Sequence, residues 1–184
     1  MNITLSALLK SAALTAVVVV AAVCYSKEDS GKLMNPHKIL SDMQQAIGYD
    51  THVITLSIVD DTQINAYATG EGKIVITTGM LDHVENESEL ASVIGHELAH
   101  FTLGHVELIS LLGEKPEGIF LKSQTMEAMS DLIGSQFAAM AGYGKCGGFT
   151  LWSRMANNGN FGTGDGSHPD SATRAHSAKN VCKS

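Results

Sequence analysis

The chain has 184 residues, of which 44% are apolar, and a formal net charge of −7. This length suits one domain with a short extension, and the apolar fraction excludes a chain that is disordered throughout. The 19 Asp and Glu outnumber the 12 Lys and Arg, which argues against a nucleic-acid partner because such binding needs a basic surface. No apolar run reaches the ~18–20 residues of an ordinary membrane span, so a polytopic membrane protein is excluded.

Residues 1–23 are predicted to be a targeting segment. The stretch 12–23 is uncharged and apolar except for one Thr, and it has the length of a signal-peptide hydrophobic region. Three alternatives remain open: cleavage near Ala22, an uncleaved membrane anchor, or cleavage followed by lipidation of Cys24. Each places the remainder outside the cytoplasm, in the bacterial periplasm or envelope, and leaves membrane association through the N-terminus open. Residues 24–184 are expected to form a single domain.

An exported protein can keep disulfides, and the chain has three cysteines. Cys146 and Cys182 bracket the C-terminal segment and are expected to be bridged, which leaves Cys24 as the odd cysteine. The alternative is that all three are free thiols.

Alternation of apolar residues predicts strands, and apolar residues repeating every three or four positions predict helices. Gly and polar residues separate these segments, with a long Gly/Asn loop over 157–166. In chain order we predict a helix over 35–47, strands over 52–59, 64–69 and 73–78, and helices over 89–112, 123–141, 146–155 and 171–181. The fold class is therefore α+β and mostly helical, with a small sheet of about three strands.

The residues His96-Glu97-Leu98-Ala99-His100 form an H-E-x-x-H motif inside an apolar helical run. Four residues turn a helix by about 400°, so the two histidines lie about 40° apart, one turn from each other. This arrangement suits one Zn²⁺ held by two imidazoles. Glu97 lies about 100° around the helix, where it can act as a general base. The alternative is a helix with two incidental histidines, and the helical context, the apolar flanks and the exported, acidic chain argue against it.

A third metal ligand is needed, and its position separates classes of zinc peptidase. A metzincin would place a His six residues after His100, where this chain has Val106. His105 lies about 140° around a continuous helix from His100, so we expect it at the surface or behind the ligands. Glu127 on the following helix is then the candidate ligand, with Asp131 holding a ligand histidine through its other ring nitrogen. From spacing alone, a solvated acidic pair explains these two residues equally well.

Taken together, five blocks resemble the family of zinc endopeptidases that includes HtpX, the CaaX prenyl protease and the LoiP-type periplasmic lipoproteins. The blocks are Asn65-Ala66-Tyr67-Ala68-Thr69, Thr78-Gly79-Met80-Leu81, the H-E-x-x-H motif with Gly104-His105, Glu127-x-x-x-Asp131, and His168-Pro169-x-x-x-x-Arg174. They extend over about residues 50–176, in the order typical of the family.

This resemblance implies a zincin-like gluzincin domain that binds one Zn²⁺ per chain through His96, His100 and Glu127, with Glu97 as the base. It further implies that His168 donates to the oxyanion of the reaction. Asp131 is expected to support a ligand histidine from behind, and Arg174 is expected to orient nearby acidic groups. The strand that begins at Asn65 and Ala66 is expected to be a sheet edge that pairs with an extended substrate.

The predicted function is a zinc-dependent metalloendopeptidase that acts on envelope or misfolded proteins, with proteins or peptides as partners. An envelope chaperone or assembly factor with a zinc-stabilised fold and little proteolysis is the alternative from a binding class. A further alternative is a structural domain whose zinc has no open coordination position for water or substrate. Neither of these needs an acid at Glu97, which favours the enzyme.

Overall fold

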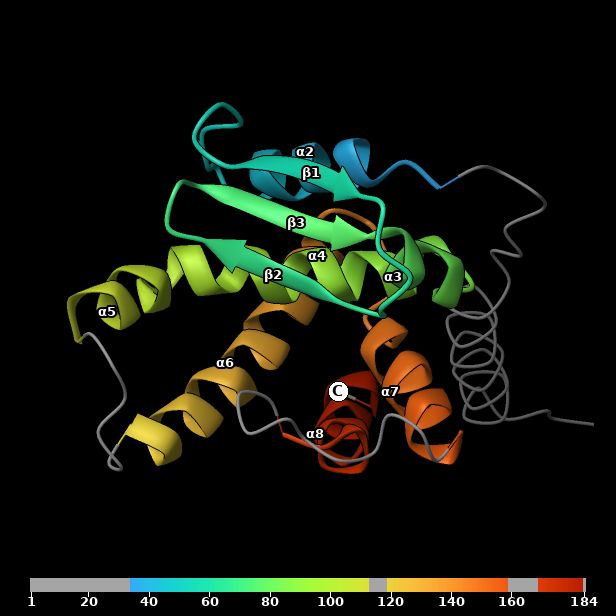
Figure 1. The fold of residues 1–184 in the computed structure, drawn as a ribbon. Coiled ribbons are helices and arrows are strands. Elements are labelled where there is room, and N and C mark those ends of the chain that lie inside the picture. Colours follow the sequence, from blue (N-terminus) through green and yellow to red (C-terminus); the bar gives the residue numbers. More distant parts are fainter. Residues whose placement is uncertain (1–33, 113–118, 159–168, 184) are drawn as a thin grey trace, which may run out of the picture. The chain divides into compact units, whose positions relative to one another are not determined.

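Three strands form a mixed sheet in the computed structural model, which describes residues 34–112, 119–158 and 169–183 (Figure 1). They are β1 (Thr55–Val59), β2 (Ala66–Thr69) and β3 (Lys73–Thr77), and their order in the sheet is β1-β3-β2. The central strand β3 is parallel to β1 and antiparallel to β2. The predicted α+β class with a three-stranded sheet is confirmed, whereas the predicted targeting segment and Cys24 lie outside the described residues.

The position of β3 in the middle of the sheet explains its composition. Its residues Ile74 and Ile76, which lie on one face of the sheet, are fully buried, as expected for a central strand with one face packed against a helix. The predicted start of the first strand at His52 is wrong. A side-chain oxygen of Asp50 accepts the backbone N–H of His52 at 2.9 Å, and this Asx turn keeps residues 52–54 out of the sheet.

Seven helices are described, and four of them match predicted ranges closely. They are α2 (Pro36–Ala46), α3 (Thr78–His83), α4 (Glu87–Thr102), α5 (His105–Leu112), α6 (Ile119–Met140), α7 (Gly147–Asn157) and α8 (Ser171–Lys183). The sequence did not predict α3, which starts where the Thr77 hydroxyl accepts the backbone N–H of Met80 at 3.1 Å. Among the described residues, no helix has the length and apolar character needed to cross a membrane.

Helix α4 is the central element of the domain. It begins at Asn86, whose side-chain oxygen accepts the backbone N–H of Glu89 at 3.0 Å, and most of its residues are buried. In Figure 1, α4 runs behind β2 and β3, and α2 runs behind β1. Helices α6 and α7 pack against α4, and α8 packs against both of them. A helix surrounded in this way is expected to be apolar on all sides, so the ionisable residues inside it need partners.

The predicted continuous helix over 89–112 is wrong, because the helix ends after α4 and a second helix, α5, begins at His105. The backbone N–H of Leu103 bonds to Ala99 and that of Gly104 bonds to Phe101, which closes the last turn of α4. Gly104 has a φ of 69°, a left-handed conformation that glycine adopts without a steric cost. Helix α5 therefore starts in a new direction at His105.

A partly buried ion pair joins the start of α4 to α7. Both guanidinium nitrogens of Arg154 donate to the two carboxylate oxygens of Glu89 at 2.7 Å, and Arg154 also donates to the carbonyl of His83 at 2.8 Å. Burial alone would raise the pKa of Glu89, but the paired guanidinium of Arg154 holds it below its usual value. This pair fixes the orientation of α7 relative to the helix that carries the H-E-x-x-H motif.

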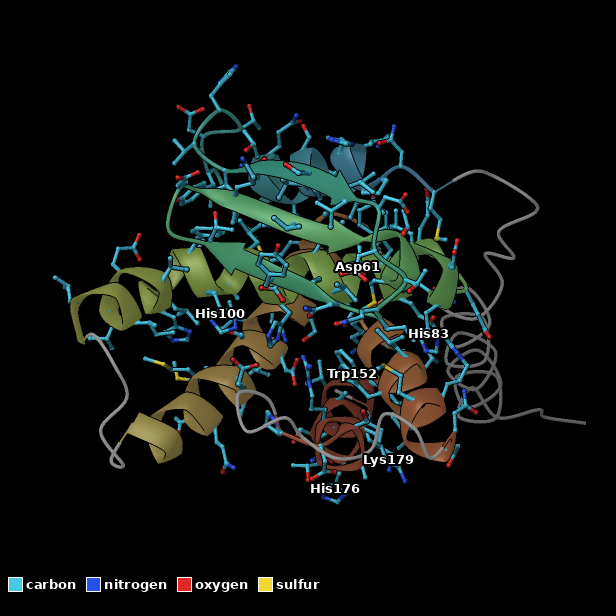
Figure 2. All side chains as sticks on the ribbon, viewed as in Figure 1. Asp61, His83, His100, Trp152, His176 and Lys179 are labelled. Atoms are coloured by element: carbon cyan, nitrogen blue, oxygen red, sulfur yellow. A yellow bond between two sulfur atoms is a disulfide. The ribbon has the colours of Figure 1, made fainter. Side chains whose placement is uncertain are left out.

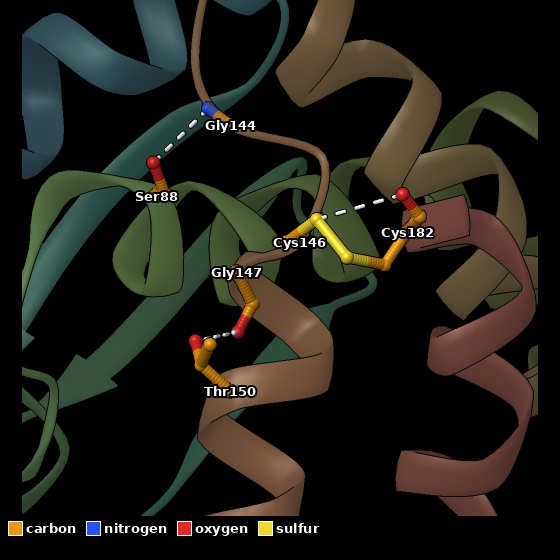
Figure 3. Close-up of a disulfide and its surroundings, with 6 residues drawn as sticks. All are labelled: Ser88, Gly144, Cys146, Gly147, Thr150 and Cys182. Carbon is orange, nitrogen blue, oxygen red and sulfur yellow. Dashed lines mark hydrogen bonds between the residues drawn. A yellow bond between two sulfur atoms is a disulfide. The ribbon is translucent and has the colours of Figure 1, made fainter. Parts of the chain in front are cut away.

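The predicted disulfide is confirmed, and it joins Cys146 at the start of α7 to Cys182 in the last turn of α8 (Figure 3). The two Cα atoms are 4.6 Å apart, within the range that a disulfide can span. The covalent link thereby holds α8, which carries Arg174, against α7 and Trp152.

Removing this disulfide is expected to destabilise the domain. Replacement of Cys146 and Cys182 by Ser frees a loop with a sequence separation of 36 residues in the unfolded chain. Loop-closure entropy predicts a decrease of about 4 kcal/mol in the free energy of unfolding. Urea unfolding of the wild type and the double variant measures this difference. A reducing agent should lower the wild-type stability and leave the variant unchanged; equal stability of the two proteins without reductant would contradict the prediction.

Candidate metal centre

Two histidines of α4 point to the same place. His96 and His100 are 3% and 8% exposed, and their Nε2 atoms are 3.1 Å apart. Figure 2 labels His100 on the side of α4 that faces α6. Their separation by one helical turn on one face follows directly from the four-residue spacing.

Glu127 reaches these histidines from α6. One carboxylate oxygen lies 3.2 Å from Nε2 of His96, and the other lies 3.3 Å from Nε2 of His100. Glu127 is itself buried. The three residues therefore converge as the sequence predicts, and they are a group that could hold a metal ion in the described part of the chain.

The donor set fits Zn²⁺. Ligands at about 2.0–2.1 Å from a tetrahedral zinc lie roughly 3.3–3.4 Å from one another. The three observed separations of 3.1, 3.2 and 3.3 Å are close to that value. Burial and Arg174 act to lower the pKa of His96, but Asp131 and Glu127 raise it to about 9. The two carboxylates therefore favour a positive charge on His96.

Asp131 holds His96 from the side away from Glu127. Its Oδ1 atom is 2.8 Å from Nδ1 of His96, and its Oδ2 atom accepts Nε–H of Arg174 at 2.9 Å. Burial would raise the pKa of Asp131, but Arg174 and His96 hold it well below its usual range. The ionised carboxylate accepts Nδ1–H of His96 and leaves the Nε2 lone pair free for a metal.

Arg174 is held in turn by Trp152, the single tryptophan of the chain. The guanidinium carbon lies 3.6 Å from the centre of the indole ring, a cation–π contact between α8 and α7. Figure 2 shows Trp152 pointing inward from α7. The sequence did not identify Trp152 as a residue of the site, because nothing local connects it to Arg174.

His105 lies behind His100. It is 6% exposed, and its Nδ1 atom is 3.2 Å from Nδ1 of His100. Of the two positions expected from the sequence, the surface is wrong and the position behind the ligands is correct. The end of the helix at Gly104 is the reason, because it turns His105 back toward His100. Burial lowers the pKa of His105, and the neighbouring His100 lowers it further.

A close crossing of two glycines brings α6 to the metal ligands. A Cβ atom on Gly134 would lie 2.4 Å from the carbonyl carbon of Gly95 and 2.5 Å from the backbone nitrogen of His96. Glu127, Asp131 and Gly134 lie on one face of α6, at helical spacings of four and three residues. The sequence did not identify Gly134, although a small residue in register with the two acids was the signal that could have indicated it.

The other predicted site residues are placed as follows. Glu97 follows His96 on α4 and is 5% exposed. Ala66 begins the edge strand β2, and Asn65 precedes it. The backbone N–H of Asn65 bonds to the hydroxyl of Thr77 and its carbonyl accepts the N–H of Thr77, so its backbone faces β3. His168 lies outside the described residues.

The fold and the site together define an α+β domain of the H-E-x-x-H metal-binding class. Residues 34–121 match the model of peptidase family M48, which confirms the resemblance to this family of zinc metalloendopeptidases. The chain is 30% identical to mitochondrial metalloendopeptidase OMA1 of Arabidopsis thaliana, over 64% of this chain and 29% of that protein.

Shorter matches include two bacterial proteases. The beta-barrel assembly-enhancing protease of Yersinia pestis is 43% identical over 27% of this chain and 10% of that protein. Protease HtpX of Xanthomonas campestris is 38% identical over 31% of this chain and 20% of that protein. This chain thus spans less than a third of the length of each of these three relatives.

Proposed function

We propose that this chain is a zinc-dependent metalloendopeptidase, a hydrolase that cleaves peptide bonds in proteins or peptides. The convergence of the donor atoms of His96, His100 and Glu127 at 3.1–3.3 Å carries this proposal. The match to peptidase family M48 supports it, and so does the buried acid Glu97 between the two histidines. In this proposal, the three converging residues bind one Zn²⁺ per chain.

The chemistry divides between the metal and Glu97. Bound zinc supplies Lewis acidity, which polarises a substrate carbonyl and lowers the pKa of water. Glu97 accepts a proton from the attacking water and delivers it to the leaving amine, as a general base and then a general acid. Because Glu97 is buried next to a ligand, its carboxylate is held in one place rather than freely solvated.

The residues around the ligands complete the proposed mechanism. Asp131 and Arg174 keep His96 in the tautomer that binds metal, which their contacts of 2.8 and 2.9 Å support. His168 is assigned as a donor to the oxyanion on the strength of the family resemblance alone. Such a donor stabilises charge that develops only during the reaction, so it affects turnover more than substrate binding.

An extended substrate is proposed to pair with β2. In the part of the chain that the structure describes, β2 is an edge of the sheet and bonds only to β3. Backbone groups alternate in direction along an antiparallel strand. Since the backbone of Asn65 faces β3, the N–H and carbonyl groups of Ala66 and Ala68 point away from β3, toward a substrate strand, and Asn65 can contribute only its side chain.

We further propose that residues 1–23 export this protein as a signal peptide or hold it to a membrane as an anchor. The apolar stretch 12–23 and the disulfide between Cys146 and Cys182 support an oxidising compartment outside the cytoplasm, the bacterial periplasm or envelope. The substrates would then be envelope or misfolded proteins, whose extended segments can reach an edge strand.

The test of the proposal begins with zinc content. Glu127→Ala is expected to lose most of its bound zinc and all of its zinc-dependent casein digestion, because only two ligands remain. Metal analysis of the dialysed protein measures the first effect, and casein digestion with and without a chelator measures the second. Glu71→Ala, at the exposed turn after β2, is the matched control and should behave like the wild type.

Two results would contradict the proposal in different ways. Undiminished zinc in Glu127→Ala would remove Glu127 from the metal centre. Full zinc occupancy in the wild type, with no digestion of casein or of unfolded protein, would exclude the peptidase and favour a structural zinc domain.

A further inference from the structure

The two histidines of the metal centre have different partners at Nδ1. Nδ1 of His96 is 2.8 Å from a carboxylate oxygen of Asp131, an arrangement that the sequence anticipates. Nδ1 of His100 is instead 3.2 Å from Nδ1 of His105, a second imidazole. The rings of His100 and His105 meet edge to face, with centres 5.1 Å apart.

We propose that His105 is a positioning residue for His100: its Nδ1 atom accepts the Nδ1–H of His100 and so directs the Nε2 lone pair of His100 to the metal. This inference rests on the zinc site proposed above. It assigns to His105 a function that the H-E-x-x-H motif does not contain, and it concerns an atom on the opposite side of the His100 ring from the metal.

The direction of this hydrogen bond follows from the chemistry of imidazole. A contact between two ring nitrogens is a hydrogen bond only when one of them carries a proton. If Nδ1 of His105 were the donor, neutral His100 would carry its own proton on Nε2. That proton would point at Nε2 of His96 and at the carboxylate of Glu127, and it would prevent metal binding. A metal-binding His100 therefore has its proton on Nδ1, and His105 is the acceptor.

The surroundings of His105 make it hard to replace as an acceptor. It is buried, so water has little access to Nδ1 of His100 from this side. Buried Ser130 of α6, between Glu127 and Asp131, places its hydroxyl 3.4 Å from the same nitrogen of His105. Two helices, α5 and α6, thus meet behind His100, and a lost acceptor there leaves a buried N–H without a partner.

The bend at Gly104 is what makes this contact available. In a continuous helix, His105 would lie about 140° around the axis from His100 and could not face it. The left-handed conformation of Gly104, with φ of 69°, ends α4 and starts α5 so that His105 points back. The chain therefore supplies its own partner for His100 from the residue directly after the bend.

Replacing His105 by Asn and by Leu separates hydrogen bonding from packing. The Oδ1 atom of Asn sits at the same branch point as Nδ1 of His and can accept the same proton, whereas Leu fills the space without an acceptor. Loss of a residue that forms a hydrogen bond to a metal ligand typically lowers metal affinity by about 10–100-fold. We expect zinc affinity, measured by competition with a chromogenic chelator, to fall about 10–100-fold in His105→Leu and to stay within a few-fold of wild type in His105→Asn.

The outcomes distinguish this inference from the proposed function. A wild-type protein that binds no zinc overturns the metal site itself. A wild type that binds zinc, together with His105→Leu of equal affinity, overturns only the role of His105, as does an Asn variant as weak as the Leu variant. Nitrogen-15 NMR of the zinc-loaded wild type gives an independent test that needs no variant: an unprotonated Nδ1 of His105 supports the inference, and a proton on Nδ1 of His105 overturns it.

Discussion

Glu97→Gln is expected to reduce peptide hydrolysis by ~10²–10⁴-fold, the usual contribution of general acid–base catalysis, while zinc content and stability stay unchanged. Gln has the shape of Glu and can still form a hydrogen bond to water, but it cannot accept a proton at neutral pH. Since Glu97 is buried and is not one of the three converging ligands, its replacement by a neutral isostere leaves the donor atoms in place.

Turnover of a quenched peptide by zinc-loaded protein measures this effect. The comparison is made at matched zinc occupancy, so that loss of metal cannot imitate loss of the base. Glu71→Gln, an exposed acid at the turn between β2 and β3, controls for removal of one negative charge. Full activity of Glu97→Gln would exclude the proposed mechanism and make the chaperone alternative the better explanation of a zinc-stabilised domain.

Gly134→Ala is expected to damage the metal centre from a distance, through the packing of two helices. The new methyl group would lie 2.4–2.5 Å from backbone atoms of Gly95 and His96, so α6 has to move away from α4. Glu127 and Asp131 move with α6, whereas His96 and His100 stay on α4. We expect a decrease of about 1–3 kcal/mol in the free energy of unfolding. We also expect zinc affinity to fall by about 10–100-fold.

Chelator competition measures the zinc affinity, and urea unfolding of the zinc-free protein measures the stability without the metal contribution. Gly70→Ala is the matched control, because nothing lies within 4 Å of the added methyl group and the residue is not in the left-handed region. If Gly134→Ala binds zinc as tightly as the wild type, α6 adjusts without moving Glu127, and the tight crossing is not needed for the site.

The local features of this protein follow from its sequence because they depend on periodicities of a few residues. The apolar run at Lys73–Thr77 indicates a buried strand, and the four-residue spacing of His96 and His100 places both imidazoles on one face of a helix. The general base between them and the three-stranded sheet are predictable for the same reason. The disulfide between Cys146 and Cys182 is a longer-range prediction, and it succeeds because only one pairing leaves Cys24, directly after the targeting segment, as the odd cysteine.

Only the tertiary structure decides which side chains meet across the helices. From spacing alone, Glu127 and Asp131 could equally be a solvated pair; the contact between Gly95 and Gly134 is what brings them to the histidines. Trp152 under Arg174 is a contact of the same kind, between α7 and α8.

His105 shows the physical reason most directly. In a continuous helix, the angle around the axis between His100 and His105 follows directly from the helical repeat. The structure differs from that expectation because Gly104 adopts a left-handed conformation. Whether a glycine continues a helix or ends it is a small difference in local free energy. The contact of His105 with Ser130 of α6 accompanies the conformation of Gly104 that ends the helix. The sequence therefore determines the motif and the elements that carry it, and tertiary packing determines the residues that hold the motif in place.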